Sequence, residues 1–177
     1  TGTFRARLSG SYLHHNRRPE ALPCVGDWVC VEKGPQDDIG IVHCLLDRRS
    51  SLQRKAVGSS GEAQMIAANL DYAIIVQSCH FDFNLNRLER YLVMVAQGGA
   101  EPLILLTKTD LIQPEQLAEL CERISNAGIV APLLTLSNIT GDGIDGLQQH
   151  LLPGKTYCLV GSSGVGKSTL INALAGG

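Results

Sequence analysis

One eight-residue segment near the end of the chain constrains its fold more than any other feature. Residues 161–168 read GSSGVGKS and match the pattern GxxxxGK[ST]. An apolar run at 157–160 precedes the segment, and an apolar helical pattern at 167–175 follows it. In such a loop, glycines let backbone N–H groups turn toward phosphate oxygens, and the positive end of the following helix points at them. The segment therefore predicts a phosphate-binding loop between a strand and a helix.

Two side chains of this loop have separate chemical roles. Lys167 is expected to neutralise the β- and γ-phosphates of a nucleotide, and Ser168 to supply a hydroxyl to Mg²⁺. The alternative is an ordinary glycine-rich turn that matches the pattern by chance. Average amino-acid frequencies give such a chance match in roughly one chain in a hundred of this length. The predicted phosphate and magnesium site comprises Gly161, Ser162, Ser163, Gly164, Val165, Gly166, Lys167, Ser168 and Thr169.

The chain from about residue 70 onward alternates predicted strands with predicted helices. This alternation is typical of a parallel sheet with helices on both faces, and predicts an α/β nucleotide domain over 61–177. The expected strands are 72–77, 103–107, 133–136 and 157–160, and the expected helices are 86–97, 114–126, 144–152 and 167–175.

The first part of the chain shows a different pattern. Residues 1–60 lack helical periodicity and carry short strand-like runs at 3–8, 28–32 and 39–46. They predict a small all-β domain, one or two strands short of a closed five-stranded barrel. Residues 57–62, VGSSGE, predict a flexible linker between the two domains.

A second motif indicates which base is bound. Thr107, Lys108, Thr109 and Asp110 follow the second strand of the α/β domain and fit the pattern [NT]KxD. An aspartate here accepts hydrogen bonds from guanine N1 and the exocyclic amine, while the lysine stem lies along the base. Adenine does not offer those donors and would leave the carboxylate unpaired. The alternative is that Asp110 only caps a helix, but its place at the carboxyl end of a parallel strand favours ligand binding.

The loop after the third strand of the α/β domain is the third candidate. Ser137 and Asn138 occupy the place where a GTPase presents a backbone N–H to guanine O6. In the alternative interpretation, Ser137 and Thr140 cap the helix that follows.

The order of these motifs differs from that of an ordinary GTPase, in which the phosphate loop comes first. The domain is therefore expected to be circularly permuted. With the strings VGDWV at 25–29, AANLDYAIIV at 67–76, NRLERYLV at 86–93 and GSSGVGKSTLINAL at 161–174, this order resembles the bacterial ribosome small-subunit-dependent GTPase family (RsgA/YjeQ).

The resemblance implies an OB-like β-barrel, a permuted P-loop GTPase domain and a C-terminal zinc-binding domain. It also implies GTP hydrolysis stimulated by the small (30S) ribosomal subunit, late in the assembly of that subunit, in the cytoplasm. GTP or GDP with Mg²⁺ is the expected ligand. The switch regions, the catalytic residues and the zinc ligands are expected beyond Gly177, so no catalytic residue is assigned except Lys167 as a stabiliser of phosphate charge.

Charge is distributed unevenly along the chain. Residues 1–60 carry a formal charge of +3 and residues 61–177 a charge of −5. A basic β domain is where a polyanion would bind, and the family resemblance indicates rRNA. A merely solvated basic surface is the alternative, and Trp28 is expected to be a core residue rather than a stacking surface. The candidate RNA contacts are Arg5, Arg7, Arg17, Arg18, Arg48, Arg49, Arg54 and Lys55, with Trp28, Tyr12 and Phe4 as candidate stacking residues.

The length of the apolar runs and the spacing of the cysteines exclude some classes of protein. No apolar run approaches the roughly 18–20 residues of a bilayer helix, so no membrane partner is expected, and neither DNA nor a second copy of the chain is predicted as a partner. Six cysteines without a CxxC pair predict reduced thiols rather than a disulfide framework. Two other functions stay open: a P-loop ATPase, which Asp110 argues against, and an RNA-binding module with structurally bound nucleotide, which Lys167 and Ser168 argue against.

Overall fold

The chain folds into two compact units. The computed structural model describes residues 2–35, 38–55, 63–80 and 83–175. One unit spans Thr1–Leu70 and the other Asp71–Gly177. The boundary thus follows Leu70 rather than residue 60, because the strand at 63–68 belongs to the first unit. Residues 57–62, predicted as a linker, lie outside the described residues.

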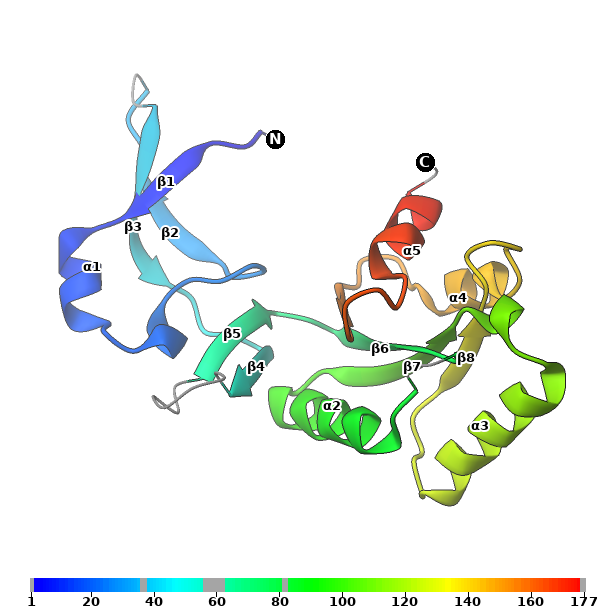
Figure 1. Ribbon diagram of the computed structural model, residues 1–177. Helices are drawn as coiled ribbons and strands as arrows, with labels where there is room; N and C mark the ends of the chain where they lie inside the picture. Colours follow the sequence, from blue (N-terminus) through cyan, green and yellow to red (C-terminus); the bar gives the residue numbers. More distant parts are fainter. Residues whose placement is uncertain (1, 36–37, 56–62, 81–82, 176–177) are drawn as a thin grey trace. The chain divides into compact units, whose positions relative to one another are not determined.

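The second unit contains a parallel sheet of four described strands. In chain order these are β6 (Tyr72–Ser78), β7 (Glu101–Thr107), β8 (Leu133–Leu136) and β9 (Tyr157–Val160). Their spatial order is β8-β7-β6-β9, and every pairing is parallel (Figure 1). The predicted α/β class is confirmed, because the central strands are buried on both faces as parallel strands require.

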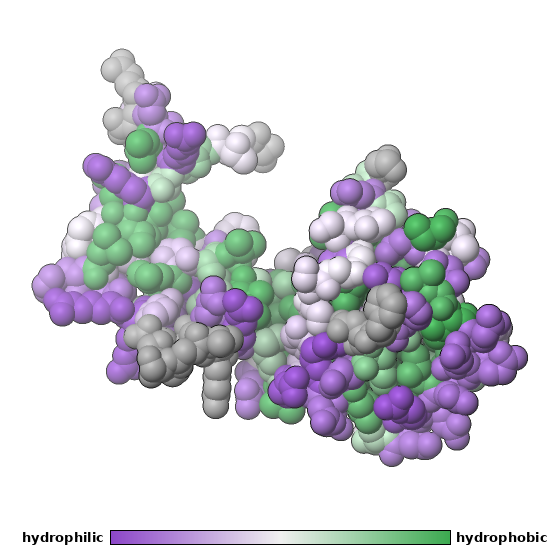
Figure 2. Space-filling model, in the orientation of Figure 1, coloured by the Kyte–Doolittle hydropathy of each residue, from purple (hydrophilic) through white to green (hydrophobic). Residues whose placement is uncertain are grey.

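Helices pack on both faces of this sheet. They are α2 (Leu85–Gly98), α3 (Pro114–Asn126), α4 (Ile144–His150) and α5 (Lys167–Leu174). In Figure 1, α2 and α3 lie on one side of the sheet and α4 and α5 on the other. In Figure 2, hydrophilic side chains cover the visible outer surface of α3, the face turned away from the sheet.

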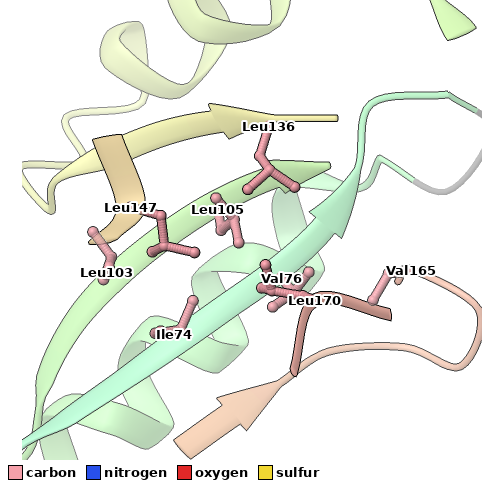
Figure 3. Packing of buried hydrophobic residues seen from close by; sticks show 8 residues of the cluster. All are labelled: Ile74, Val76, Leu103, Leu105, Leu136, Leu147, Val165 and Leu170. Carbon is pink, nitrogen blue, oxygen red and sulfur yellow. The ribbon is translucent and has the colours of Figure 1, made fainter. Parts of the chain in front are cut away.

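The core under α4 and α5 supports the phosphate loop directly. Side chains from three strands meet Leu147 of α4, Leu170 of α5 and Val165 of the loop between β9 and α5 (Figure 3). Val165 and Leu170 are at most 1% exposed. The loop is therefore anchored at its centre by a buried apolar side chain, with the glycines on either side of it.

Local signals set the ends of α2. The Asn84 side chain accepts a hydrogen bond from the Arg87 amide at 2.9 Å and begins the helix. Gly99, at a φ of 73°, adopts the left-handed conformation that ends it.

The first unit contains five described strands in two sheets. A three-stranded sheet has the order β1-β3-β2, with β1 (Arg5–Leu8) parallel to β3 (Ile39–Leu45) and β2 (Val29–Glu32) antiparallel to it. The other sheet pairs β4 (Ser51–Lys55) with β5 (Ala63–Ala68). Five strands match the number in an OB-type barrel. Their recorded pairings, within the part of the chain that is described, form two separate sheets.

The predicted β domain also contains two short helices that the sequence did not indicate. Residues Gly10–His15 form helix α1, and Pro19–Ala21 form a short 3₁₀ helix. The Ser9 side chain accepts from the Tyr12 amide at 3.1 Å and caps α1, and the buried Tyr12 hydroxyl donates to the Ala21 carbonyl at 2.5 Å. A six-residue helix is too short to produce a visible 3.6-residue period in the sequence.

A buried ion pair holds the first unit together. The Arg48 guanidinium donates to both carboxylate oxygens of Asp27, at 2.8 and 2.7 Å, and to the carbonyls of Glu20 and Leu22. The side chains of Asp27 and Arg48 are only 1% and 15% exposed. Burial alone would raise the pKa of Asp27, but hydrogen bonds from Arg48 and the Cys24 amide outweigh burial and hold that pKa below its ordinary value.

Candidate nucleotide-binding site

The loop between β9 and α5 has the backbone shape of an anion cradle. Gly161, Gly164 and Gly166 have positive φ angles of 153°, 77° and 100°. A Cβ on Gly161 would lie 2.3 Å from the Val76 carbonyl oxygen, so this position needs glycine for space as well as for conformation. Gly166 is the N-cap of α5, so the positive end of that helix faces the loop.

Lys167 spans this loop. Its ammonium donates to the Gly161 carbonyl at 2.9 Å and to the Ser162 carbonyl at 2.5 Å. The loop is thereby curled around the positive charge that a phosphate group would meet. The next two residues, Ser168 and Thr169, are exposed at the start of α5.

Thr107 connects the TKTD segment to the phosphate loop. Its buried hydroxyl lies 2.6 Å from the Val165 carbonyl oxygen and 3.2 Å from the Gln77 carbonyl oxygen. Lys108 follows at a φ of 62°, a left-handed conformation that is uncommon outside glycine. The contact fixes the end of β7 against the loop, although the two lie 58 residues apart in the sequence.

The Asp110 side chain is held by one hydrogen bond and remains exposed. The buried Ser137 hydroxyl donates to Asp110 Oδ1 at 2.5 Å. The same Ser137 oxygen accepts from the amides of Ile139 and Thr140, at 3.2 and 3.1 Å. Ser137 therefore shapes its own turn and positions the aspartate at once, while the N-cap of α4 is Gly143 rather than Ser137 or Thr140.

Asn138 lies between the loop after β8 and the phosphate loop. Its Nδ2 is 3.5 Å from the Gly166 carbonyl oxygen, and a Cβ on Gly166 would come within 2.8 Å of that nitrogen. Its Oδ1 is buried and has no hydrogen-bond partner among the described residues. The side chain brings the predicted base-reading loop into contact with the N-cap of α5.

All predicted nucleotide contacts therefore lie at one edge of the sheet. The edge is formed by the carboxyl ends of β6, β7, β8 and β9, where ligands of parallel sheets bind. The nearby Cys79 is buried, and burial raises the pKa of its thiol to about 12. The residues brought together are Thr107, Lys108, Asp110, Ser137, Asn138 and the loop from Gly161 to Thr169.

Sequence reasoning missed one supporting residue at this edge. Gln77 is a fully buried amide near the end of β6. Its Oε1 accepts from the Asn84 amide at 3.0 Å, and its Nε2 donates to the Asn84 carbonyl at 3.3 Å. It fixes the start of α2 beside the edge. The signal was present in the sequence, since Gln77 directly follows the apolar run of β6.

The candidate RNA contacts of the first unit divide into two groups. Arg5, Arg7, Arg17, Arg18, Arg49 and Arg54 are exposed, whereas the Lys55 side chain is outside the described part. Arg48 was wrongly included, because its donors are bound inside the unit. Tyr12 is buried and bonded to Ala21, so it offers no stacking surface.

Trp28 contradicts the expectation that it belongs to the core. It is 69% exposed, because it precedes β2 on the outward side of the alternation that turns Val29 and Val31 inward. Phe4 is 55% exposed, and the Lys33 ammonium lies 5.6 Å from its ring centre. Trp28 and Phe4 are thus the two aromatic candidates that remain accessible.

The described residues contain neither a cluster of metal ligands nor a membrane-spanning helix. No three His, Cys, Asp or Glu side chains cluster as ligands of a metal ion in the described ranges. Among the same residues, no helix combines the length and apolar character needed to cross a bilayer.

Comparison with known proteins identifies relatives of the whole chain. Residues 45–177 match the family model described as RsgA GTPase. The chain is 41% identical to the small ribosomal subunit biogenesis GTPase RsgA of Opitutus terrae, covering 99% of this chain and 49% of that protein. It is 48% identical to the protein of the same name from Methanosarcina acetivorans, covering 97% of this chain and 45% of that one. The chain thus spans about half the length of the curated relatives it matches.

Solved structures give the same result for the fold. The crystal structure of YjeQ from Thermotoga maritima superposes with a TM-score of 0.72 at 26% identity, over 97% of this chain and 56% of that one. YloQ, described as a circularly permuted GTPase, superposes with a TM-score of 0.64 at 26% identity, over 98% of this chain and 56% of that one. The predicted permuted GTPase fold is confirmed.

Proposed function

Because the chain belongs to the RsgA GTPase family, we propose that it binds GTP and GDP where its phosphate loop meets the TKTD segment. The observation that carries the proposal is the Ser137–Asp110 hydrogen bond. It holds an exposed carboxylate in a fixed position at the same sheet edge as the phosphate loop. A fixed carboxylate suits the paired donors of guanine and disfavours adenine, which would leave it unpaired.

The remaining base contacts come from the two neighbouring segments. The Asn138 backbone N–H is the proposed donor to guanine O6. Asn138 lies in the turn that Ser137 shapes after β8, and its side chain is close to Gly166 of the phosphate loop. The stem of Lys108 is proposed to cover one face of the base. Together with Asp110 these groups would read the hydrogen-bonding edge of guanine.

The phosphates are proposed to bind the backbone amides at the start of α5. On binding, the Lys167 ammonium would exchange its loop carbonyls for the β- and γ-phosphate oxygens. The site also fits Mg²⁺, because a single exposed Ser168 hydroxyl is the ligand set expected for an ion held mainly by phosphate oxygens and water. When bound, Mg²⁺ neutralises charge that develops on the phosphates.

We also propose that the protein acts by GTP hydrolysis in late assembly of the 30S subunit, stimulated by that subunit in the cytoplasm. The names of the curated relatives support this activity. Lys167 acts in it as a stabiliser of phosphate charge, and no general base is assigned among residues 1–177. A zinc site beyond residue 177 remains an expectation from the family resemblance.

Competitive titration tests the nucleotide proposal. The purified chain with Mg²⁺ should bind GDP at least tenfold more tightly than ADP, which corresponds to about 1.4 kcal/mol. Equal affinities for GDP and ADP would favour the P-loop ATPase alternative. Binding of both nucleotides unaffected by Mg²⁺ and by Lys167→Ala would favour a module with structurally bound nucleotide.

The proposed rRNA contact rests on the exposed arginines of the first unit. Arg5 and Arg7 are two residues apart on β1, so both project from the same face of that strand, and both are exposed. Arg5→Glu with Arg7→Glu should weaken binding to 30S subunits and reduce the salt dependence of that binding, while GDP affinity stays unchanged. Unchanged subunit binding over a range of salt concentrations would assign these arginines to a merely solvated surface.

A further inference from the structure

Two thiols face each other in the three-stranded sheet of the first unit. Cys30 on β2 and Cys44 on β3 are direct partners in the antiparallel register. Residues directly opposite in an antiparallel pair project from the same face of the sheet. Cys30 is exposed and Cys44 is half-buried, so small molecules in solution can reach the pair.

The register fixes the spacing of the two backbones. Two residues before Cys30, the Trp28 carbonyl accepts from the Leu46 amide at 2.9 Å, which makes Cys30 and Cys44 a hydrogen-bonded pair by alternation. Such pairs have Cα atoms about 5.5 Å apart, inside the range of roughly 4.4–6.8 Å found for disulfides. The spacing of the two Cα atoms is therefore compatible with a cross-strand disulfide.

Closing that disulfide requires a small local movement. Opposite Cβ atoms lie about 4.5–5.5 Å apart in a sheet, with hydrogen-bonded pairs at the longer end, whereas a disulfide needs about 3.5–4.5 Å. The register already shifts between Cys30 and Val31, where the ladder is irregular and can adjust. An exposed bond formed under such strain is easily reduced again.

The other cysteines lack this arrangement. Cys158 on β9 has Ala73 as its partner, and Cys79 and Cys121 lie outside the strands. Burial also raises the pKa of these three thiols. Burial, together with a hydrogen bond to Asp27, raises the pKa of Cys24 to about 11. For Cys30 the leading cause of its raised pKa is an interaction with the thiol of Cys44, its partner in the register.

We propose that Cys30 and Cys44 form a redox-active dithiol, which small disulfides such as glutathione disulfide oxidise reversibly to a cross-strand disulfide. The Cys30 thiolate attacks one sulfur of glutathione disulfide, which forms a mixed disulfide and releases one glutathione thiolate. The Cys44 thiol then gives up its proton and attacks Cys30 Sγ, which releases the second glutathione. Two electrons pass from the protein to the reagent, and the two thiol protons end on the two glutathione molecules.

Mass spectrometry of the native chain tests this proposal. After treatment with glutathione disulfide and trypsin, the peptides 18–33 and 34–48 should be joined and lack two hydrogens. Dithiothreitol should separate them again. In Cys44→Ser, glutathione should remain attached to Cys30, because the resolving thiol is absent.

Cys24 provides the matched control because it lies on the same tryptic peptide as Cys30. Cys24→Ser should leave the cross-link unchanged, whereas Cys30→Ser should abolish it. Stable glutathione on Cys30 in the parent chain would overturn the proposal, since it would show that Cys44 cannot resolve the mixed disulfide. Survival of the cross-link in Cys30→Ser would overturn it as well, by assigning the link to Cys24.

Discussion

Replacing Arg48 with alanine should unfold the first unit at much lower denaturant concentration while leaving the second unit unaffected. The substitution removes the bidentate partner of a carboxylate that is 1% exposed, and it leaves the Glu20 and Leu22 carbonyls without their donor. Removing one partner of a buried ion pair costs about 3–5 kcal/mol, because an uncompensated charge stays buried. That loss is a large share of the roughly 5–15 kcal/mol that stabilises a typical domain.

The effect of Arg48→Ala on stability should depend on pH, whereas a simple loss of packing should not. The pKa of Asp27 is lowered in the folded unit, so the ion pair adds stability above the ordinary carboxyl pKa, and this stability is lost as pH falls through the lower folded value. In Arg48→Ala the remaining burial should favour the protonated form of Asp27. The difference in stability between parent and variant should therefore shrink as the pH is lowered.

Hydrogen exchange measured by mass spectrometry at increasing urea concentrations can follow the two units separately. Peptides from residues 2–35 and 38–55 should lose protection in Arg48→Ala, whereas peptides from 83–175 should not. Arg49→Ala is the control, because its exposed side chain predicts a change within about 0.5 kcal/mol. The double variant Arg48→Ala with Asp27→Ala should be more stable than Arg48→Ala alone. The reasoning fails if Arg48→Ala lies within about 1 kcal/mol of the Arg49→Ala control, below the smallest cost of breaking a buried pair.

Three further predictions concern the nucleotide site. Asp110→Asn should shift the preference from guanine to xanthine nucleotides in competition titrations, because the amide reverses one hydrogen-bonding role while Ser137 can still hold the side chain. Lys167→Ala should weaken the binding of GTP more than the binding of GMP in the same assay, since the ammonium is proposed to meet only the β- and γ-phosphates. Equal losses of affinity for GTP and GMP would contradict that role. Gly161→Ala should lower the stability of the ligand-free second unit by more than Gly164→Ala, whose left-handed backbone alone costs about 1–2 kcal/mol. A Cβ on Gly161 would lie 2.3 Å from the Val76 carbonyl oxygen, whereas a Cβ on Gly164 meets nothing within 4 Å, so equal melting temperatures would refute the argument.

The second unit could be predicted almost completely from the sequence, because its signals are local. Each parallel strand is a short apolar run, and the central strands β6 and β7 are buried on both faces. Strands β8 and β9 have the predicted bounds. The phosphate loop and the TKTD segment are each continuous in the sequence. Their position at one edge followed from the rule that parallel strands end together.

The first unit could be predicted only in part, because tertiary contacts determine it. Arg48 resembled any basic surface residue, and only the folded chain brings it to Asp27, 21 residues away. Strands β4 and β5 carry polar and alanine residues that give weak alternation, so they were missed, and with them the true domain boundary.

In the second unit, the contact between Asn138 and Gly166 could not be predicted for the same reason, since no short motif joins the two residues.

Among the described strands β9 lies next to β6 in space but comes last of the four in the chain, and this order affects when the proposed site can form during protein synthesis. The ribosome releases β6, β7 and β8, with Asp110 and Ser137, before it releases β9 and the phosphate loop. A nascent chain can thus complete its base-reading half while the flank of β6 that will receive β9 is still open. Under the proposed function, nucleotide would bind only the state in which β9 has joined the sheet, and mass action would then stabilise that step of folding. Nucleotide concentration in the cell would in this way influence the yield of folded protein as well as its occupancy.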